Sequence, residues 1–525
     1  MQVKRSLTRS LLLCVALIVT LGLLNGAVVM KTDAETAAYH EVSTSEIDAY
    51  VRRQMDRLGV PGASLAIVEG DEIVHMRGFG RARPGGEAVS PQTPFLIGSL
   101  TKSFTALAVM QLVEAGEVDM DAPVQRYLPW FRVADPEASA RITVRHLLNQ
   151  TSGLPTASGW IPLADFDDGP GAVERQARQL SEVSLSHPVG SAFEYSNSNY
   201  NLLGLVIEAV SGESYADYVQ SHIFAPLDMG RSTTSQAVAK ENGLAVGHRY
   251  WFWFPVAVRD LPMPRGSLPS GQLISSSEDM AHYLIALLNE GRYGDAQILS
   301  GAGIAELHRG AAEHVAMGIS MGTYGMGWYT GEIGGTKAVW HTGTVPEFSS
   351  YMALLPEQKR GVVLLMNADH FMMEPALTEV GDGLTTLLAG RQPAPIRLGF
   401  IPWVMRGLLL IPLLQIAGVV LTVRRLRRWR RDPMSRPSGM GKWGRHVLLP
   451  LIPNLLVTLT LLPMLGAMRG FWRLFTPDFS WIATVCGTFA GLWSLLRTGL
   501  VLRALEEPPA SEPVSSDVDS PGQPG

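Results

Sequence analysis

The stretch IGSLTKSFTALAVMQLVEAG, from Ile97 to Gly116, decides how this chain folds and what chemistry it can carry. After Lys102 the run is almost uniformly apolar, so we expect a buried helix over Ser99–Ala115. Positions i and i+3 share one face of a helix, which places Lys102 beside the Ser99 hydroxyl at the helix N-terminus. A lysine withdrawn from water loses its charge readily and can take the proton of a serine, which makes Ser99 a candidate nucleophile.

The pattern S-x-x-K is common by chance, and its alternative interpretation is a capped helix whose lysine reaches the surface. A second motif, Tyr195-Ser196-Asn197, lies in a predicted turn before a helix. A phenol there can relay a proton if nearby cations lower its pKa, and the amide can orient a carbonyl or the lysine. The alternative for Tyr195 is an ordinary core aromatic.

The third motif is His341-Thr342-Gly343, on a strand predicted to lie at the edge of a sheet. Glycine at such a position lets the backbone-like amide of a substrate approach closely. A strand histidine satisfied by its neighbours is the alternative interpretation. Three motifs in this order are hard to attribute to chance, and together they indicate an active site.

Strand patterns flank a helical middle. ASLAIVEGDEIVHMRGFG predicts two strands joined at Gly70-Asp71, and SSYMALLPEQKRGVVLLMNA predicts a second hairpin with its turn at Pro356–Gly361. We therefore expect an α+β fold, with a largely antiparallel sheet flanked by helices and an inserted helical domain. The other predicted helices are Thr143–Leu148, Asn201–Val210, Tyr215–Ile223 and Ser277–Asn289.

The motifs resemble those of the serine β-lactamases and penicillin-recognising hydrolases, in the class C-like branch with esterases and D-amino-acid peptidases. SLTK, YSN and HTG stand in that order, and residues 142–155 and 269–284 resemble framework segments. The resemblance covers roughly residues 42–390 and implies a β-lactamase/DD-peptidase-like fold. It implies an acyl-enzyme on Ser99, Lys102 as base, and Tyr195 as the shuttle to the leaving group or the deacylating water.

The resemblance also implies an oxyanion hole formed by the backbone N–H groups of Ser99 and Thr344. The family usually has lysine first in the third motif, where this chain has His341. A neutral imidazole attracts a substrate carboxylate less than an ammonium does, which favours an ester or amide other than a β-lactam. The implied substrate-binding residues are Asn197, His341, Thr342 and Gly343.

Composition argues against several other functions. The net charge is only -5 over 525 residues, so the chain lacks the overall positive charge typical of nucleic-acid binding, and we expect no nucleic-acid partner. Both cysteines, Cys14 and Cys486, lie in apolar segments, and no H-E-x-x-H or phosphate-loop pattern occurs, so we expect no metal and no cofactor. A rival G-x-S-x-G pattern, Gly318 to Gly322 with Ser320, is followed by TYGMGWYTGEIGG, which is too rich in glycine for the helix this motif requires.

Both ends of the chain indicate a membrane. Basic residues precede an apolar stretch from Leu11 to about Met30, so residues 1–30 are predicted to be a signal peptide or an N-terminal anchor. Only 17% of the residues are charged, and residues 400–503 hold three apolar runs near the length of a membrane span, which predict three transmembrane helices. These runs are Gly407–Val423, Val447–Met464 and Trp481–Leu496.

Charge predicts the orientation of these helices. Nine Lys/Arg lie from Arg424 to Arg445, whereas the next connection has only Arg469 and Arg473. The positive-inside rule places the first loop in the cytoplasm, so residues 31–399 form an extracytoplasmic domain of a multi-pass membrane protein. The acidic, Pro/Ser-rich tail 504–525 is predicted to be disordered.

Three classes of function fit these patterns. The first is a membrane-tethered serine hydrolase acting on a small ester, amide or peptide, with cell-wall fragments among the candidates. The second is a penicillin-binding-like protein that binds a cell-wall peptide or transfers an acyl group with little hydrolysis. The third is an idle binding or signalling module, which would have no need of a Ser–Lys pair. The aromatic stretch Arg249–Pro264 stays open between core packing, a wall of the acyl site and the membrane interface.

Overall fold

The computed structural model describes residues 42–506, except 161, 162, 164, 165, 260–262, 317, 318, 440, 467 and 468. The predicted N-terminal segment 1–30 and nearly all of the predicted tail lie outside the described residues. The chain forms two compact units. The first holds the described residues up to Trp160, Phe166–Arg249 and Pro255–Trp403, and the second holds Leu163, Tyr250–Phe254 and the residues from Val404 onward.

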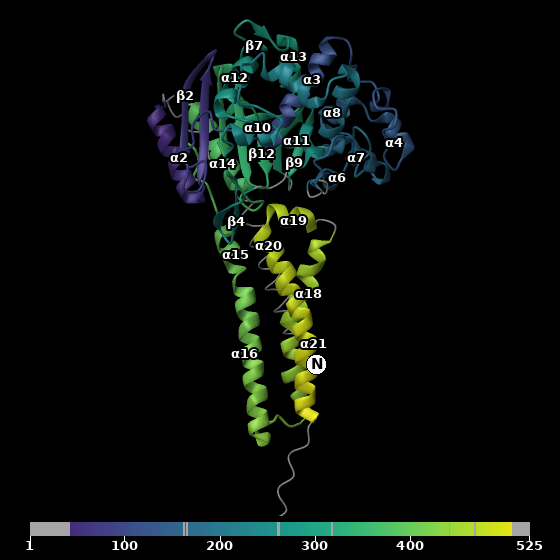
Figure 1. Cartoon of the computed structure of the whole chain (residues 1–525), viewed down its shortest axis with the longest axis vertical. Helices are drawn as coiled ribbons and strands as arrows, with labels where there is room; N and C mark the ends of the chain where they lie inside the picture. The colour runs from purple at the N-terminus through teal and green to yellow at the C-terminus, as the bar shows by residue number, and fades with distance from the viewer. Residues whose placement is uncertain are drawn as a thin grey trace, which may run out of the picture. The chain divides into compact units, whose positions relative to one another are not determined.

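The first unit is built on an eight-stranded antiparallel sheet, in the order β2-β1-β14-β13-β12-β11-β10-β9 (Figure 1). Both predicted hairpins are confirmed: β1 (Gly62–Glu69) pairs with β2 (Glu72–Gly80), and β13 (Phe348–Leu355) pairs with β14 (Arg360–Met366). β1 also pairs with β14, so a strand from near the start of the unit lies beside a strand from near its end. The other strands are β9 (Ala312–Ala316), β10 (Ile319–Gly325), β11 (Trp328–Ile333) and β12 (Thr336–Val345).

The strand that carries His341 is not an edge strand, so that prediction is wrong. β12 lies between β13 and β11 because the glycine-rich segment before it forms strands that extend the sheet. β11, however, pairs with β12 only from Thr336 to Trp340. Residues 341–345 therefore have β13 on one side and no paired strand of the described residues on the other.

Helices cover both faces of the sheet, which buries β13 along its whole length. α14 (Glu374–Leu388) packs on one face, where Tyr351 contacts the backbone position of Gly381. α12 (Ser277–Leu288) packs on the other face against β1 and β14. An N-terminal helix, α2 (Thr44–Leu58), lies against α14 and begins with a capping box at Ser43.

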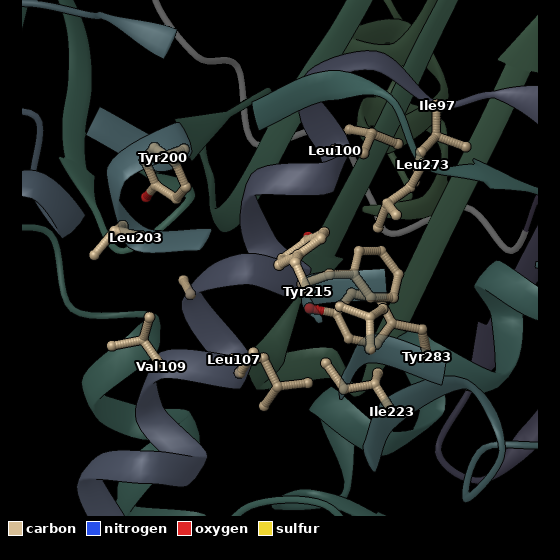
Figure 2. Close-up of a cluster of buried hydrophobic side chains, with 14 of the residues drawn as sticks. Ile97, Leu100, Leu107, Val109, Tyr200, Leu203, Tyr215, Ile223, Leu273 and Tyr283 are labelled. Atoms are coloured by element: carbon tan, nitrogen blue, oxygen red, sulfur yellow. The ribbon is translucent and has the colours of Figure 1, made fainter. Parts of the chain in front are cut away.

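The helical part is packed around α3 (Thr101–Glu114), in which every residue from Thr101 to Met110 is buried. Figure 2 shows Leu107 and Val109 of this helix among side chains from several other elements. Phe104 stacks on Tyr283 with ring centroids 4.0 Å apart, and Thr105 shares a 2.7 Å hydrogen bond with the Tyr215 hydroxyl. The expected buried helix after Lys102 is thus confirmed.

The remaining predicted helices of this unit are also present. α8 begins four residues earlier than predicted, and the helix predicted from Tyr215 is α9 followed by a π-helical turn, Gln220–Phe224. The bounds are α5 (Val144–Leu148), α8 (Asn197–Ser211) and α9 (Tyr215–Val219). Shorter elements are α4 (Pro136–Arg141), α6 (Thr156–Trp160), α7 (Ala172–Arg178), α10 (Gln236–Glu241), α11 (Leu268–Gly271), α13 (Gly301–Leu307), β3 (Phe95–Leu96), β4 (His248–Trp251), β5 (Phe254–Ala257), β6 (Ile274–Ser275), β7 (Arg292–Tyr293), β8 (Ala296–Gln297) and β15 (Ala368–Asp369).

The second unit is helical. Two stretches in the described part of the chain, Ile401–Arg431 and Pro477–Glu506, are helices long and apolar enough to cross a membrane. The remaining predicted span, Val447–Met464, forms α18 (Leu449–Leu465), which has 17 residues and packs beside α21 (Gly487–Glu506) (Figure 1). The other helices are α15 (Ile401–Gly407), α16 (Leu410–Arg431), α17 (Gly441–Trp443), α19 (Arg469–Phe475) and α20 (Pro477–Trp481).

The aromatic segment Tyr250–Phe254 belongs by its contacts to the second unit. The Phe252 N–H donates to the Asp478 carboxylate of α20 over 3.0 Å. The Arg406 guanidinium of α15 lies 5.4 Å from the centre of the Trp253 ring. Within the predicted stretch Arg249–Pro264, these contacts show that Tyr250–Phe254 packs against the C-terminal helices, and they leave the three interpretations of the whole stretch open.

The packing around α3 generates a stability prediction. Leu107 is fully buried, so Leu107→Ala should lower the free energy of unfolding by about 2–5 kcal/mol through lost burial and a residual cavity. The exposed Val238→Ala on α10 is the control and should change it by less than about 0.5 kcal/mol. Urea unfolding followed by circular dichroism measures both. Equal effects of the two substitutions would contradict a core centred on α3.

Candidate active site

Ser99 and Lys102 lie together where β3 leads into α3. Ser99 sits in a 3₁₀ turn, Gly98–Leu100, directly before the helix, and Lys102 occupies the first turn of α3. The Lys102 Nζ is 3.0 Å from the Ser99 Oγ, as the i and i+3 spacing predicts. The Lys102 side chain is fully buried rather than directed to the surface.

The surroundings of Lys102 contain oxygen acceptors and no carboxylate among its described contacts. Its Nζ donates to the Asn197 Oδ1 over 2.8 Å and to the Ser270 carbonyl over 2.6 Å. Burial lowers the pKa of Lys102 well below its ordinary value of 10.5, because no negative charge offsets the loss of water. A neutral amine with a free lone pair beside a serine hydroxyl can act as a general base.

Tyr195 lies just before α8, held there by Gln150, whose side chain accepts from the Ser196 N–H over 3.0 Å. The Lys102 Nζ is 4.8 Å from the centre of the Tyr195 ring. Desolvation raises the pKa of Tyr195 well above 10, helped by neighbouring phenols and opposed by a hydrogen bond with Ser99. The condition stated for a proton relay, a pKa lowered by nearby cations, is therefore not met, because burial is the largest cause of the shift and raises the pKa. A phenol that keeps its proton is suited to donate it.

His341 is buried, with only 1% of its surface exposed. Its Nδ1 lies 2.5 Å from the Thr342 carbonyl oxygen, so Nδ1 carries the proton and Nε2 is left as an acceptor, 3.5 Å from the Tyr324 hydroxyl. Burial, the largest cause, lowers the pKa of His341 to about 3. At physiological pH this side chain is a neutral hydrogen-bonding group and supplies no charge for a substrate carboxylate.

The two backbone N–H groups implied as the oxyanion hole lie on segments that approach unusually closely. A Cβ on Gly98, whose φ is +53°, would lie 2.6 Å from the Thr344 nitrogen. A Cβ on Gly343 would lie 2.2 Å from the carbonyl oxygen of Ile97, so this glycine admits a neighbouring segment of the protein rather than the substrate alone. The structure thus places Thr344 beside the turn that holds Ser99.

Sequence reasoning missed several residues of the site. Tyr324 meets the His341 ring edge to face and Tyr329 meets it at a tilt, with ring centroids 5.8 and 5.5 Å away, and both come from strands that the glycine-rich sequence did not reveal. Glu374, at the start of α14, accepts a 3.3 Å hydrogen bond from the Thr344 hydroxyl. Gln150 and Ser270 lay within the framework segments, but nothing in their local sequence marked them as contacts of the motifs.

Two alternative hypotheses, a nucleophile elbow at Ser320 and a metal site, can be compared with the described residues. Ser320 lies inside β10 and is exposed, whereas a nucleophile elbow requires a turn between a strand and a helix. Gly318 is outside the described residues. No group of three or more His, Cys, Asp or Glu side chains in the described part of the chain could hold a metal ion.

This site combines a serine, a buried amine, a phenol with a raised pKa and a close approach of the Gly98–Leu100 turn to Thr344, an arrangement compatible with acyl transfer through a serine. Residues 47–384 match the protein family described as "Beta-lactamase". The chain therefore belongs to the family of β-lactamases and penicillin-binding proteins and has its serine hydrolase fold.

Individual relatives agree with this assignment. Penicillin-binding protein 4 of Amycolatopsis lactamdurans is 31% identical over 315 residues, which cover 59% of this chain and 81% of that protein. Protein flp of Staphylococcus aureus (strain MW2) is 30% identical over 337 residues, or 62% of this chain and 63% of the relative's length. The chain thus spans less than two thirds of Protein flp.

A solved structure has the same fold. The octameric penicillin-binding protein homologue from Pyrococcus abyssi superposes with a TM-score of 0.59 at 29% sequence identity, covering 68% of this chain and 79% of that chain.

The state of His341 generates a kinetic prediction. His341→Lys should lower kcat on a neutral ester by about 100-fold, because the buried acceptor that faces Tyr324 is replaced by a donor. Since the pKa of His341 is already near 3, the wild-type rate should show no inflection from this residue between pH 5 and 8. The measurement is kcat and kcat/KM against pH on paired neutral and anionic esters. A gain restricted to the anionic ester, with kcat on the neutral ester unchanged, would contradict this role.

Proposed function

We propose that this protein is a serine hydrolase of the class C-like branch that forms an acyl-enzyme on Ser99 with an ester or amide substrate. The observation that carries the proposal is the Lys102 amine, buried without a carboxylate and 3.0 Å from the Ser99 hydroxyl. A lysine that served only to stabilise the fold would be expected to pair with an acid or to reach water. Its position instead supports a base.

The remaining groups support a complete sequence of steps. Lys102 takes the proton of Ser99 as the Oγ attacks the substrate carbonyl carbon, and the N–H groups of Ser99 and Thr344 hold the oxygen that becomes negative. Tyr195 gives its proton to the leaving oxygen or nitrogen as that bond breaks, and Lys102 returns the proton to the phenol. Water then attacks the acyl-enzyme, with a proton passing back to Ser99. Asn197 keeps the lysine in place through its 2.8 Å hydrogen bond.

We further propose that the C-terminal unit anchors the enzyme in a membrane as a multi-pass protein, with the catalytic domain outside the cytoplasm. Only 6% of the apolar window in Ile401–Arg431 is buried by protein, so this helix is not a core helix of the unit. Leu414 and Ile416 on α16 are 71% and 60% exposed. Side chains of this kind are stable in lipid and unfavourable in water, which supports insertion.

The name of one relative suggests a class of substrate. Because one relative is a penicillin-binding protein, a cell-wall peptide or its ester is a candidate, and a second function follows from the same site: binding or acyl transfer with little hydrolysis. The two differ in what removes the acyl group. Water gives a free acid, whereas transfer gives a new ester or amide with an added alcohol or amine.

The first prediction here concerns Ser99. Ser99→Ala should abolish labelling by a fluorophosphonate or a fluorescent penicillin and lower turnover of a simple ester by more than about 10³-fold, because the nucleophile is lost. Ser320→Ala, which changes the exposed serine of the rival pattern, is the matched control and should behave as wild type. Esterase activity that survives in purified Ser99→Ala would contradict the assignment. Mass spectrometry of the products, with and without added D-amino acid, distinguishes hydrolysis from transfer.

The second prediction concerns topology. Nine basic residues from Arg424 to Arg445, against two in the next connection, should keep that loop and a tag placed after residue 525 in the cytoplasm. Protease added to intact cells should therefore degrade residues 31–399 and spare the tag, and lysed cells should lose both. Removal of the tag from intact cells with the large domain spared would show that the orientation is reversed.

A further inference from the structure

Glu374 carries a carboxylate next to the proposed oxyanion hole. It is the first residue of α14, and its Oε1 accepts a 3.3 Å hydrogen bond from the Thr344 hydroxyl. The backbone N–H of the same Thr344 is a proposed donor to the substrate's carbonyl oxygen. A group held by Glu374 would therefore lie only a few bonds from the carbonyl that Ser99 attacks.

Among the residues that the structure describes, no cationic side chain pairs with this carboxylate. Its described contacts include the Thr344 hydroxyl and no lysine or arginine. Burial raises the pKa of Glu374, and the hydrogen bond from Thr344 opposes that change. A shielded carboxylate without a countercharge is unfavourable by itself and is stabilised by a positive group that arrives from outside.

The charge of Glu374 affects the pKa values of two tyrosines in the site. The pKa of Tyr195 is raised chiefly by burial and by two neighbouring phenols, and Glu374 adds to that rise. Glu374 also raises the pKa of Tyr329, after burial. The negative charge of the Glu374 carboxylate therefore affects the part of the site that holds Tyr195.

The site offers little positive charge to a substrate carboxylate. The Lys102 amine is buried and already donates to Asn197 and Ser270, and its charge is disfavoured. His341 is neutral and buried. An anionic group near Thr344 would meet Glu374 without a compensating cation, whereas an ammonium group there would form an ion pair.

We propose that Glu374 forms a cation-binding subsite next to Thr344, so that the enzyme prefers substrates with an ammonium group near the scissile bond over those with a carboxylate there. This inference rests on the proposed function, since it concerns the substrate of the Ser99 site. It assigns Glu374 the role of a specificity residue, which acts on substrate choice and takes no part in proton transfer.

The test uses two thioacetate esters of the same shape, whose leaving groups carry a trimethylammonium group or the neutral tert-butyl isostere, and a third ester with a carboxylate. For the full-length protein in detergent, kcat/KM should be highest for the ammonium ester and lowest for the carboxylate. Glu374→Gln should lower the ratio of the ammonium to the neutral ester by about 10-fold, the size expected for one shielded ion pair. Glu379→Gln removes a charge from the same helix, at an exposed position, and should leave the ratio unchanged.

The outcomes separate the subsite from the proposed function. If wild type hydrolyses none of the three esters and Ser99 is not labelled, the proposed function fails. If wild type hydrolyses them but Glu374→Gln leaves the ratio unchanged, the subsite alone is overturned. Should Glu374→Gln fail to fold by circular dichroism, wild type decides alone: an ammonium to neutral ratio at or below one overturns the subsite, and a ratio well above one with poor hydrolysis of the carboxylate supports it.

Discussion

The burial of the Lys102 amine without a partner acid is the constraint on which the rest of the site depends. A charged ammonium in that position would lose its hydration without compensation, so the neutral form is favoured. Its three polar neighbours come from different elements: Ser99 from the turn before α3, Asn197 from α8 and Ser270 from α11. The proposed base therefore keeps these contacts only when the three elements are packed together, which links the proposed reactivity to the integrity of the helical part.

A second constraint is the close approach of the Gly98–Leu100 turn to β12. Glycine at 98 and at 343 removes the Cβ atoms that would collide with backbone across this contact. The same approach brings the N–H of Thr344 beside Ser99 and sets Glu374 one side chain away from it. The sheet thus contributes more than a scaffold, since β12 supplies the proposed oxyanion donor and the neutral His341, and Thr344 of the same strand contacts the carboxylate of the proposed subsite.

The chain uses long apolar helices in two physically different ways. In α3 the apolar side chains are enclosed by protein and keep water away from Lys102. In α16 the apolar side chains are mostly exposed, and the buried positions among the described residues of that helix are few. The first arrangement creates a low-dielectric site for chemistry, and the second creates a surface suited to lipid. Both helices have an apolar composition, so composition alone does not distinguish a helix enclosed by protein from a helix suited to lipid.

The amino-acid sequence by itself determined the features that depend on short separations along the chain. The Ser99 and Lys102 pair follows from helical spacing, both hairpins follow from apolar strands around polar turns, and the order of the three motifs identified the family before any coordinates. Only the tertiary structure decided the interior position of β12, the raised pKa of Tyr195 and the place of Glu374 beside Thr344. The physical reason is that desolvation and electrostatics depend on distances between residues far apart in the chain, as with the 30 positions between Thr344 and Glu374, and local periodicity carries no information about those distances.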